Sequence, residues 1–500
     1  MAIVNHSGNI DTSETWAAAD EHHITGAITV GKSGDATEAK VTVSDNVIVY
    51  YDGNYAWTGV NNATAVGRLY AVASDWSNKI TFMADPTTYP EPTRSMYNGL
   101  NIAYTLHVDY EYVHIYHATW GFVQLGIDSA GGDAGSVDIN HSVVEWCTDM
   151  VNEPGDGDHS NAISIQNVVG VASGAIFGTA DLGANVAWTG GLTVGRVYHA
   201  EPNTASFGST SATSYGFNVS EWVWHGPQQS SAINAIHLQM IGTPPTFSDC
   251  YIGKIMQSTQ GQVYITADIG GAVDFTDCVF YKAGNYGFYV TANQTGDDWT
   301  LTTCDFIDSP GYGVIGPNGA GDGTLTNCYF YRNNNRDCVE PGTATDEYQY
   351  INVEGSISLE STPNFPLEVD NVVEGAPDTN SITITFDSAS GAGGGRAHGI
   401  GFVLYGTTSG IYTHQTIFPH MVVDMAGCWC SIRPDLGVFA QTGHSVTIEN
   451  LKSGTTYYYK PCFIDPLGRV AEGTEGSFDT TAAAGGGGAN YNIGEGGISV

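Results

Sequence analysis

The centre of the chain carries one short pattern four times, at Phe247–Ile252, Phe275–Phe280, Leu301–Phe306 and Leu325–Phe330. Each copy has a cysteine at its fourth position, namely Cys250, Cys278, Cys304 and Cys328, so the steps are 28, 26 and 24 residues. A near-constant step of this size is typical of stacked repeats. Apolar residues at the first, fourth and sixth positions predict one β-strand per repeat, with each cysteine stacked on the next.

The rest of each repeat agrees with a coil of short strands. A second strand is expected at Gly284–Val290 and at Gly311–Ile315, and polar loops come next at Thr291–Asp298 and Gly316–Gly323. The pattern resembles the right-handed parallel β-helix family, which includes pectate-lyase-like enzymes and bacteriophage tailspikes. The resemblance implies an all-β solenoid over residues 1–362, whose irregular N-terminal part caps one open end.

The composition changes at Pro363–Pro366, and the residues after this point have a different pattern. Ser381–Phe386 alternates like a strand, and Leu451–Tyr457 has the form Leu-x-x-x-Thr-x-Tyr. This part resembles a fibronectin type III domain, an immunoglobulin-like β-sandwich, and the resemblance implies that the Tyr457 hydroxyl closes a tyrosine corner. We expect the sandwich at residues 363–482 and a flexible Gly-rich tail at 483–500.

Charge excludes two classes of partner. The chain has 15 Lys plus Arg against 52 Asp plus Glu, a net charge of −37. Nucleic acid and anionic membrane surfaces both need clustered cations, so neither is expected to bind. No apolar run is long enough for membrane insertion, and the first residues lack the features of a Sec signal.

The nine cysteines are expected to be mostly reduced. The four in the repeat behave as small buried apolar residues, as in a protein assembled in a cytoplasm. The state of Cys428, Cys430 and Cys462 stays open.

Candidates for catalysis come from the same repeats. Lys254 and Lys282 each follow a repeat cysteine by four residues, while Asp249 and Asp277 each precede one. A β-helix polysaccharide lyase uses a Lys or Arg base together with calcium held by carboxylates, and a glycosidase uses paired carboxylates. The same positions suit ordinary surface turns, which we favour. No cofactor is expected, calcium being implied only for a lyase, and the histidines at 107, 114 and 117 show no zinc-ligand spacing.

Aromatic residues offer candidates for binding. Trp222 and Trp224 alternate onto one face of a strand. Two adjacent indoles can stack on sugar rings, or they can fill a coil interior or a subunit interface, which we favour.

Together these features favour binding over cutting. We expect a structural or adhesion protein exposed on a bacteriophage virion, as a tailspike, fibre or capsid decoration, made in the host cytoplasm. Its partners would be other virion proteins and host-surface glycan, and the resemblance leaves a homotrimer open. The alternatives are a polysaccharide depolymerase on the same scaffold and an extracellular or cell-surface adhesin or filament subunit.

Overall fold

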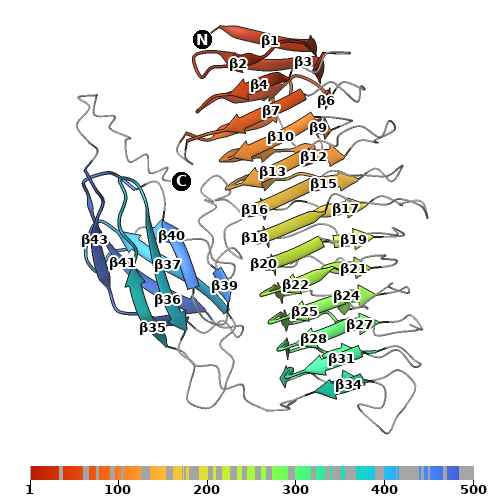
Figure 1. Cartoon of the computed structure of the whole chain (residues 1–500), viewed down its shortest axis with the longest axis vertical. Coiled ribbons are helices and arrows are strands. Elements are labelled where there is room, and N and C mark those ends of the chain that lie inside the picture. Colours follow the sequence, from red (N-terminus) through yellow and green to blue (C-terminus); the bar gives the residue numbers. More distant parts are fainter. Residues whose placement is uncertain are drawn as a thin grey trace.

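In a computed structural model, the chain forms a parallel β-solenoid followed by a β-sandwich (Figure 1). The structure describes residues 2–32, 38–59, 67–74, 78–89, 96–102, 106–125, 136–153, 162–171, 173, 176–179, 191–200, 207–209, 217–225, 234–238, 245–253, 261–265, 273–290, 299–316, 323–331, 333, 338–339, 351–354, 368–388, 399–412, 414–415, 438–440, 444–448, 451–464 and 470–482.

The solenoid strands form one continuous 34-stranded sheet that winds into three faces. Equivalent strands of successive coils pair in parallel, because each coil returns the chain one strand spacing further along the axis. The first face comprises β2 (Glu14–Trp16), β4 (Ala39–Val43), β7 (Gly67–Val72), β10 (Leu106–Glu111), β13 (Ser136–Asn140), β16 (Ala162–Val171), β18 (Leu192–Ala200), β20 (Phe217–His225), β22 (Thr246–Ser248), β25 (Val273–Thr276), β28 (Trp299–Thr302), β31 (Gly323–Thr326) and β34 (Ile351–Glu354).

The longer strands turn a corner and serve two faces. The ends of β16, β18 and β20 continue into the second face, and β1 and β3 run from the second face into the third. The second face comprises β1 (Ile3–Ile10), β3 (Glu21–Val30), β5 (Ile48–Tyr51), β8 (Ile80–Ala84), β11 (Val113–Tyr116), β14 (Val143–Glu145), β23 (Tyr251–Gly253), β26 (Val279–Tyr281), β29 (Asp305–Ile307) and β32 (Tyr329–Tyr331). The third comprises β6 (Ala56–Gly59), β9 (Tyr97–Ile102), β12 (Ala118–Leu125), β15 (Asp149–Glu153), β17 (Phe177–Thr179), β19 (Phe207–Ser209), β21 (Ile236–Leu238), β24 (Gly261–Ile265), β27 (Tyr286–Val290), β30 (Val314–Ile315) and β33 (Cys338–Val339).

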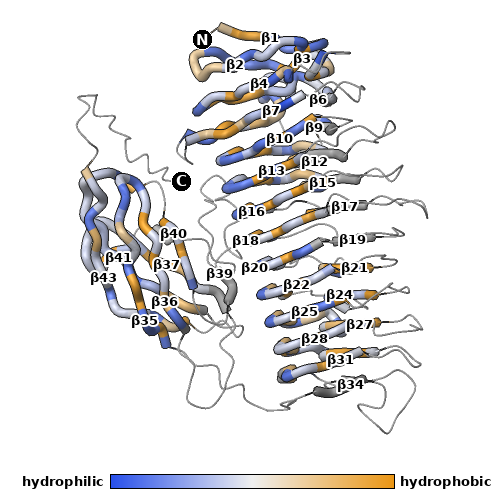
Figure 2. Tube along the Cα trace, viewed as in Figure 1, coloured by the Kyte–Doolittle hydropathy of each residue, from blue (hydrophilic) through white to orange (hydrophobic). Residues whose placement is uncertain are grey.

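The interior is made of columns in which like residues stack from coil to coil. Phe280, Phe306 and Phe330 stack with ring centroids 4.8 and 5.0 Å apart. The register pairs Phe275 with Leu301 and Val279 with Asp305, so the cysteines between them occupy equivalent positions on neighbouring coils. Cys250, Cys278, Cys304 and Cys328 are all buried, and none of them is in a disulfide. Figure 2 shows the apolar residues recurring at matching points of successive strands.

One residue per coil turns the chain from the first face to the second. It has a left-handed backbone, with φ between 43° and 61°, and the column consists of Asn46, Tyr112, His141, Asn167, Glu221, Asp249, Asp277, Thr303 and Asn327. Asn and Asp adopt this conformation at lower cost than other non-glycine residues. The polar residue before each repeat cysteine is therefore a corner residue.

The second domain is an antiparallel sandwich. One sheet contains β35 (Val369–Glu374), β36 (Ile382–Ser388) and β40 (His444–Ile448). The other contains β37 (Gly399–Gly406), β38 (His414–Gln415), β39 (Val438–Ala440), β41 (Thr456–Ile464), β42 (Val470–Glu472) and β43 (Gly476–Asp479). Ile384, Phe386, Val403 and Tyr459 are buried between the sheets. The expected boundary at 363 and the tail at 483–500 lie outside the described residues.

Figure 1 shows the sandwich beside the solenoid. Phe402 and Cys462 belong to the same buried cluster as the solenoid core, so apolar side chains connect the two domains. Among the residues in the described ranges, no helix has the length and hydropathy to cross a membrane.

Candidate functional site

A shallow hollow lies on the outer side of the first face. It has a volume of about 250 Å³ and is lined by Ser136, Asp138, Ala162, Ile163, Ser164, Gly191, Leu192, Thr193 and Asn218. The register places Asp138 opposite Ser164, Ser164 opposite Thr193, and Thr193 opposite Asn218. These four side chains therefore form a line across four coils, which we call the polar row.

The row continues beyond the hollow on both sides. Asp109 precedes Asp138, and the later positions are Thr246, Asp274, Thr300 and Thr324. On each strand, the described positions on either side of these residues are buried. On β28 and β31, for example, buried and half-buried residues alternate, so the residues of the polar row point outward. A chain of hydroxyl, amide and carboxyl groups at one-coil spacing thus runs along the solenoid.

The negative charge near the N-terminal end of the polar row is partly neutralised. The Arg68 guanidinium donates from Nε to Asp109 Oδ2 at 2.6 Å, and this bond raises the pKa of Arg68. Burial and the neighbouring charge of Asp109 raise the pKa of Asp138. His107 Nδ1 lies 3.0 Å from Ser136 Oγ at the edge of the hollow. The lining of the hollow is an even mixture of polar and apolar groups, and Asp138 is its one charged side chain.

A second outward-facing feature, the tyrosine strip, lies on the third face. His237, Tyr264 and Tyr289 occupy matching outward positions on β21, β24 and β27, with ring centroids 5.0 and 5.3 Å apart. Tyr286 lies beside Tyr289, and Tyr312 stacks on Tyr286 at 5.8 Å. The rings stack on one another, so they present mainly edges and hydroxyl groups to the outside.

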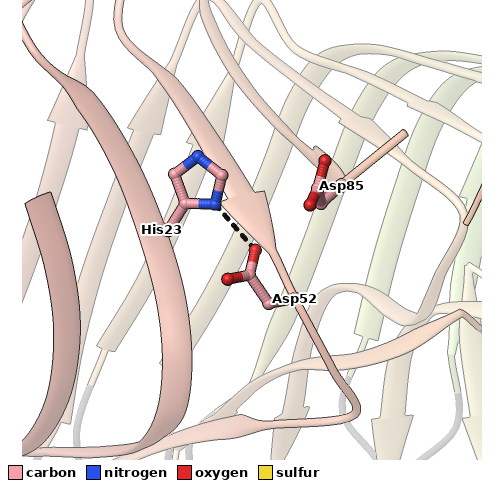
Figure 3. A group of neighbouring side chains, drawn as sticks. All are labelled: His23, Asp52 and Asp85. Carbon is pink, nitrogen blue, oxygen red and sulfur yellow. Dashed lines mark hydrogen bonds and ion pairs between the residues drawn. The ribbon is translucent and has the colours of Figure 1, made fainter. Parts of the chain in front are cut away.

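A histidine–carboxylate cluster lies near the N-terminal end of the second face (Figure 3). His23 comes from β3, Asp52 directly follows β5, and Asp85 directly follows β8. One nitrogen of His23 and one oxygen of each carboxylate all lie within 4.8 Å of one another. His23 and Asp85 are more than nine-tenths buried, while the Asp52 side chain is 29% exposed.

Both ring nitrogens of His23 face carboxylates. Nδ1 lies 2.7 Å from Asp52 Oδ1, and Nε2 lies 3.2 Å from Glu21 Oε1. Burial lowers the pKa of His23, but the bonds to the two carboxylates outweigh burial, and the net pKa is raised. For Asp85, burial is outweighed by hydrogen bonds from Thr87 and Thr88, so its pKa is lowered.

Of the residues proposed for catalysis, Asp249 and Asp277 stack on neighbouring coils, whereas Lys282 lies at a different corner. Asp249 and Asp277 are corner residues between the first and second faces, with φ of 51° and 54°. Lys282 is exposed at the next corner, beyond β26, with Nζ 5.1 Å from the Tyr281 ring centroid. A whole strand, on the order of 10 Å, separates Asp277 from Lys282. Lys254 lies outside the described residues.

The interpretation of Trp222 and Trp224 as a sugar-binding platform is wrong for this structure. Both indoles are fully buried, and Trp222 occupies the coil position that Cys250 occupies one coil later. They belong to the solenoid core, which is the alternative that the sequence favoured. The two indoles do share one face of the strand, but that face points inward.

The three histidines near residue 110 do not converge on one site. His107 faces the hollow, His117 is a corner residue with φ of 60°, and His114 is buried on β11. His114 Nε2 lies 3.1 Å from Glu145 Oε1, and burial lowers the pKa of His114. Reasoning from the sequence did not identify His23, Asp52 and Asp85, because no local spacing connects residues on three coils.

Comparisons with known proteins add little to this geometry. No protein-family model matches the chain. No curated protein matches it either. Among solved structures, the catalytic unit of the thermostable GH87 alpha-1,3-glucanase from Streptomyces thermodiastaticus strain HF3-3 is similar, with a TM-score of 0.25 and 11% identity. The match covers 67% of this chain and 63% of that chain, and at this TM-score it carries no argument about activity.

Proposed function

We propose that this protein binds an uncharged glycan along the polar row of the first face and does not cleave it. The observation that carries the proposal is the hollow in which Asp138, Ser164, Thr193 and Asn218 lie in one line. Carboxyl, hydroxyl and amide groups are suitable partners for sugar hydroxyls, because each can donate or accept several hydrogen bonds. The coil spacing of about 4.8 Å is close to the length of one sugar unit in an extended chain.

Charge favours an uncharged ligand over an acidic one. The chain carries a net charge of −37, and the row contains carboxylates at Asp109, Asp138 and Asp274. Arg68 is already paired with Asp109 and does not line the hollow. An acidic polysaccharide would therefore be repelled.

The absence of turnover is supported by how the candidate catalytic groups lie. General acid–base catalysis needs titratable groups within hydrogen-bond reach of the same bond. Asp277 and Lys282 lie at opposite ends of β26, a position that does not favour their acting on one bond.

A binding and turnover assay tests this function. The protein is titrated with neutral glycans such as dextran, galactan and mannan, and with acidic polygalacturonate. We expect a neutral glycan to bind, and Asp138→Ala combined with Asn218→Ala to weaken binding at least tenfold. Thr383→Ala is the control, because this partly exposed threonine lies on β36 of the sandwich and not on the polar row. New reducing ends, or equal binding of polygalacturonate, would contradict the proposal.

We further propose that the solenoid is displayed on a bacteriophage virion, as a tailspike, fibre or capsid decoration. Two observations support this proposal: the repeat resembles that of tailspikes, and six cysteines in the described part of the chain are in no disulfide, as in a protein assembled in a reducing cytoplasm. Mass spectrometry of purified virions from the source tests the location. Recovery only in cell-surface fractions would favour the adhesin alternative, and sedimentation analysis would distinguish a homotrimer from a monomer.

We also propose that the sandwich is a fibronectin type III-like domain. Tyr457 Oη accepts a hydrogen bond from the backbone N–H of Lys452 at 2.9 Å, the arrangement of a tyrosine corner. The order β35-β36-β40 in one sheet and β38-β37-β41 in the other follows the same division of strands. An experimental structure with a different strand order would reject this assignment.

A further inference from the structure

The histidine–carboxylate cluster has a geometry suited to a metal ion. We propose that His23, Asp52 and Asp85 bind one divalent transition-metal ion, with Zn²⁺ as the best fit, and that this ion cross-links three successive coils. The three residues come from β3, β5 and β8, which are consecutive neighbours on the second face. The proposal is independent of glycan binding on the first face.

The distances are close to those that one ion requires. Zinc binds histidine nitrogen and carboxylate oxygen at about 2.0–2.2 Å, so two ligand atoms of one tetrahedral ion lie about 3.3–3.6 Å apart. The three candidate ligand atoms lie within 4.8 Å of one another, and His23 Nδ1 is already 2.7 Å from Asp52 Oδ1. Side-chain adjustments of about 1 Å would bring the three ligand atoms to these separations.

The surroundings hold two of the ligands in position. Metal-binding histidines usually direct their other nitrogen to a carboxylate, which orients the ring. Glu21 Oε1 lies 3.2 Å from His23 Nε2 and meets this requirement. Asp85 accepts hydrogen bonds from Thr87 N at 2.8 Å, Thr87 Oγ1 at 2.5 Å and Thr88 Oγ1 at 3.0 Å, so its carboxylate is oriented before any ion arrives.

The ligand set selects the class of metal. A nitrogen ligand disfavours calcium and magnesium, which prefer all-oxygen sites. The lack of thiolate disfavours Cu⁺, and imidazole with carboxylates is suitable for Zn²⁺ and binds it more tightly than Mn²⁺ or Fe²⁺. Three protein ligands leave the fourth position of a tetrahedral zinc ion for water, on the side where Asp52 is partly exposed.

Metal binding is tested on the full chain after treatment with a chelator. Zn²⁺ is titrated by calorimetry, and thermal unfolding is followed with and without it. We expect one site in the micromolar range or tighter and a higher melting temperature with zinc. Calcium at the same concentration should have no effect. Cobalt should give the visible absorption of a tetrahedral N/O site.

Variants locate the site. His23→Gln, Asp52→Asn and Asp85→Asn should each weaken this zinc binding at least tenfold, and Glu21→Gln should weaken it about tenfold or more, because it orients the ring. His107→Gln is the control, a histidine on another face that should leave zinc affinity unchanged. Circular dichroism confirms that each variant is folded. No zinc binding by the wild type, or zinc binding that survives both Asp variants, would overturn the proposal.

Discussion

The two ends of the solenoid fill the same interior in different ways. The coils between residues 246 and 331 repeat one solution, with cysteine and phenylalanine columns in which each residue stacks on its own kind. The coils up to residue 200 place polar side chains inside, and the rings of His6 and His22 stack on Trp16 with centroids 3.9 and 5.2 Å away. His114 and Glu145 are likewise almost fully buried, 3.1 Å apart. A coil therefore needs a side chain that fills its column, and it accepts a polar one if that side chain has a hydrogen-bond partner.

This difference has a consequence for stability. Apolar columns stabilise through burial and ring stacking, which do not depend on pH. Buried histidines must stay neutral, so the N-terminal coils should lose more stability in acid than the C-terminal coils.

The largest expected effect comes from breaking a uniform column. Phe306→Ala removes the middle ring of a stack of three and should lower the free energy of unfolding by about 3–5 kcal/mol. Chemical denaturation followed by tryptophan fluorescence measures the loss. Thr300→Ala, an outward change on β28, should stay within about 0.5 kcal/mol and serves as the control. Equal effects of both changes would refute the column model.

Removing a polar contact from the interior should lower the free energy of unfolding by a smaller amount. Glu145→Ala removes the carboxylate next to His114 and should lower the free energy of unfolding by about 1–3 kcal/mol. Glu145→Gln should lose less, because an amide still offers a hydrogen-bonding group of the same shape. The same denaturation experiment compares the two variants. A glutamine variant that is less stable than the alanine variant would argue against the contact between Glu145 and His114.

The response to pH sharpens the comparison further. Burial lowers the pKa of His6 to about 4 and that of His199 to about 3, from 6.5. A lowered pKa means that the unfolded chain binds the proton first, so this stability is complete above pH 6.5 and is lost as the pH falls toward 4. Burial raises the pKa of the Cys278 and Cys304 thiols, which therefore stay neutral throughout this range.

Hydrogen exchange at pH 7 and pH 5 would show this contrast residue by residue. We expect the amides of β1 to β18 to lose more protection at pH 5 than those of β25 to β32. His199→Gln should flatten the pH dependence of unfolding relative to the wild type. A uniform loss of amide protection along the solenoid would mean that protonation of carboxylates, and not of buried histidines, dominates the response to acid.

The smallest effect is expected at a corner. Lys282 has φ of 49° and sits over the Tyr281 ring. Lys282→Gly relieves backbone strain but loses the cation–π contact and adds freedom to the unfolded chain, so the net change should be within about 1 kcal/mol. Glycan binding should be unchanged. A glycan cleavage activity that disappears in this variant would revive the catalytic interpretation of Lys282.

Much of the fold could be predicted from the sequence alone. The repeated cysteine pattern identified the coils between residues 246 and 331, because identical residues recur at one step along the chain. The earlier coils were predicted only from composition. Their residues at the repeat-cysteine position are Val113, Ser142, Val168, Val197 and Trp222, so none of these coils has a cysteine there although all share a place in the fold.

The candidate sites depended on the tertiary structure. His23, Asp52 and Asp85 are separated by 29 and 33 residues, and Asp138 and Asn218 lie three coils apart. The alternation in the sequence correctly put Trp222 and Trp224 on one face, yet it could not say that this face is the inner one.

The physical reason is that two separate features determine a solenoid, namely the pattern within each strand and the register between coils. Alternating apolar and polar residues determine which stretches form strands, and this is local to each strand. Which strands become neighbours depends on how many residues each corner and loop absorbs, and coils as different in length as 24 and 43 residues stack in this one solenoid. The sequence by itself determined the kind of fold and the residues available to it, and only the coil-to-coil register decided which of them meet on one surface.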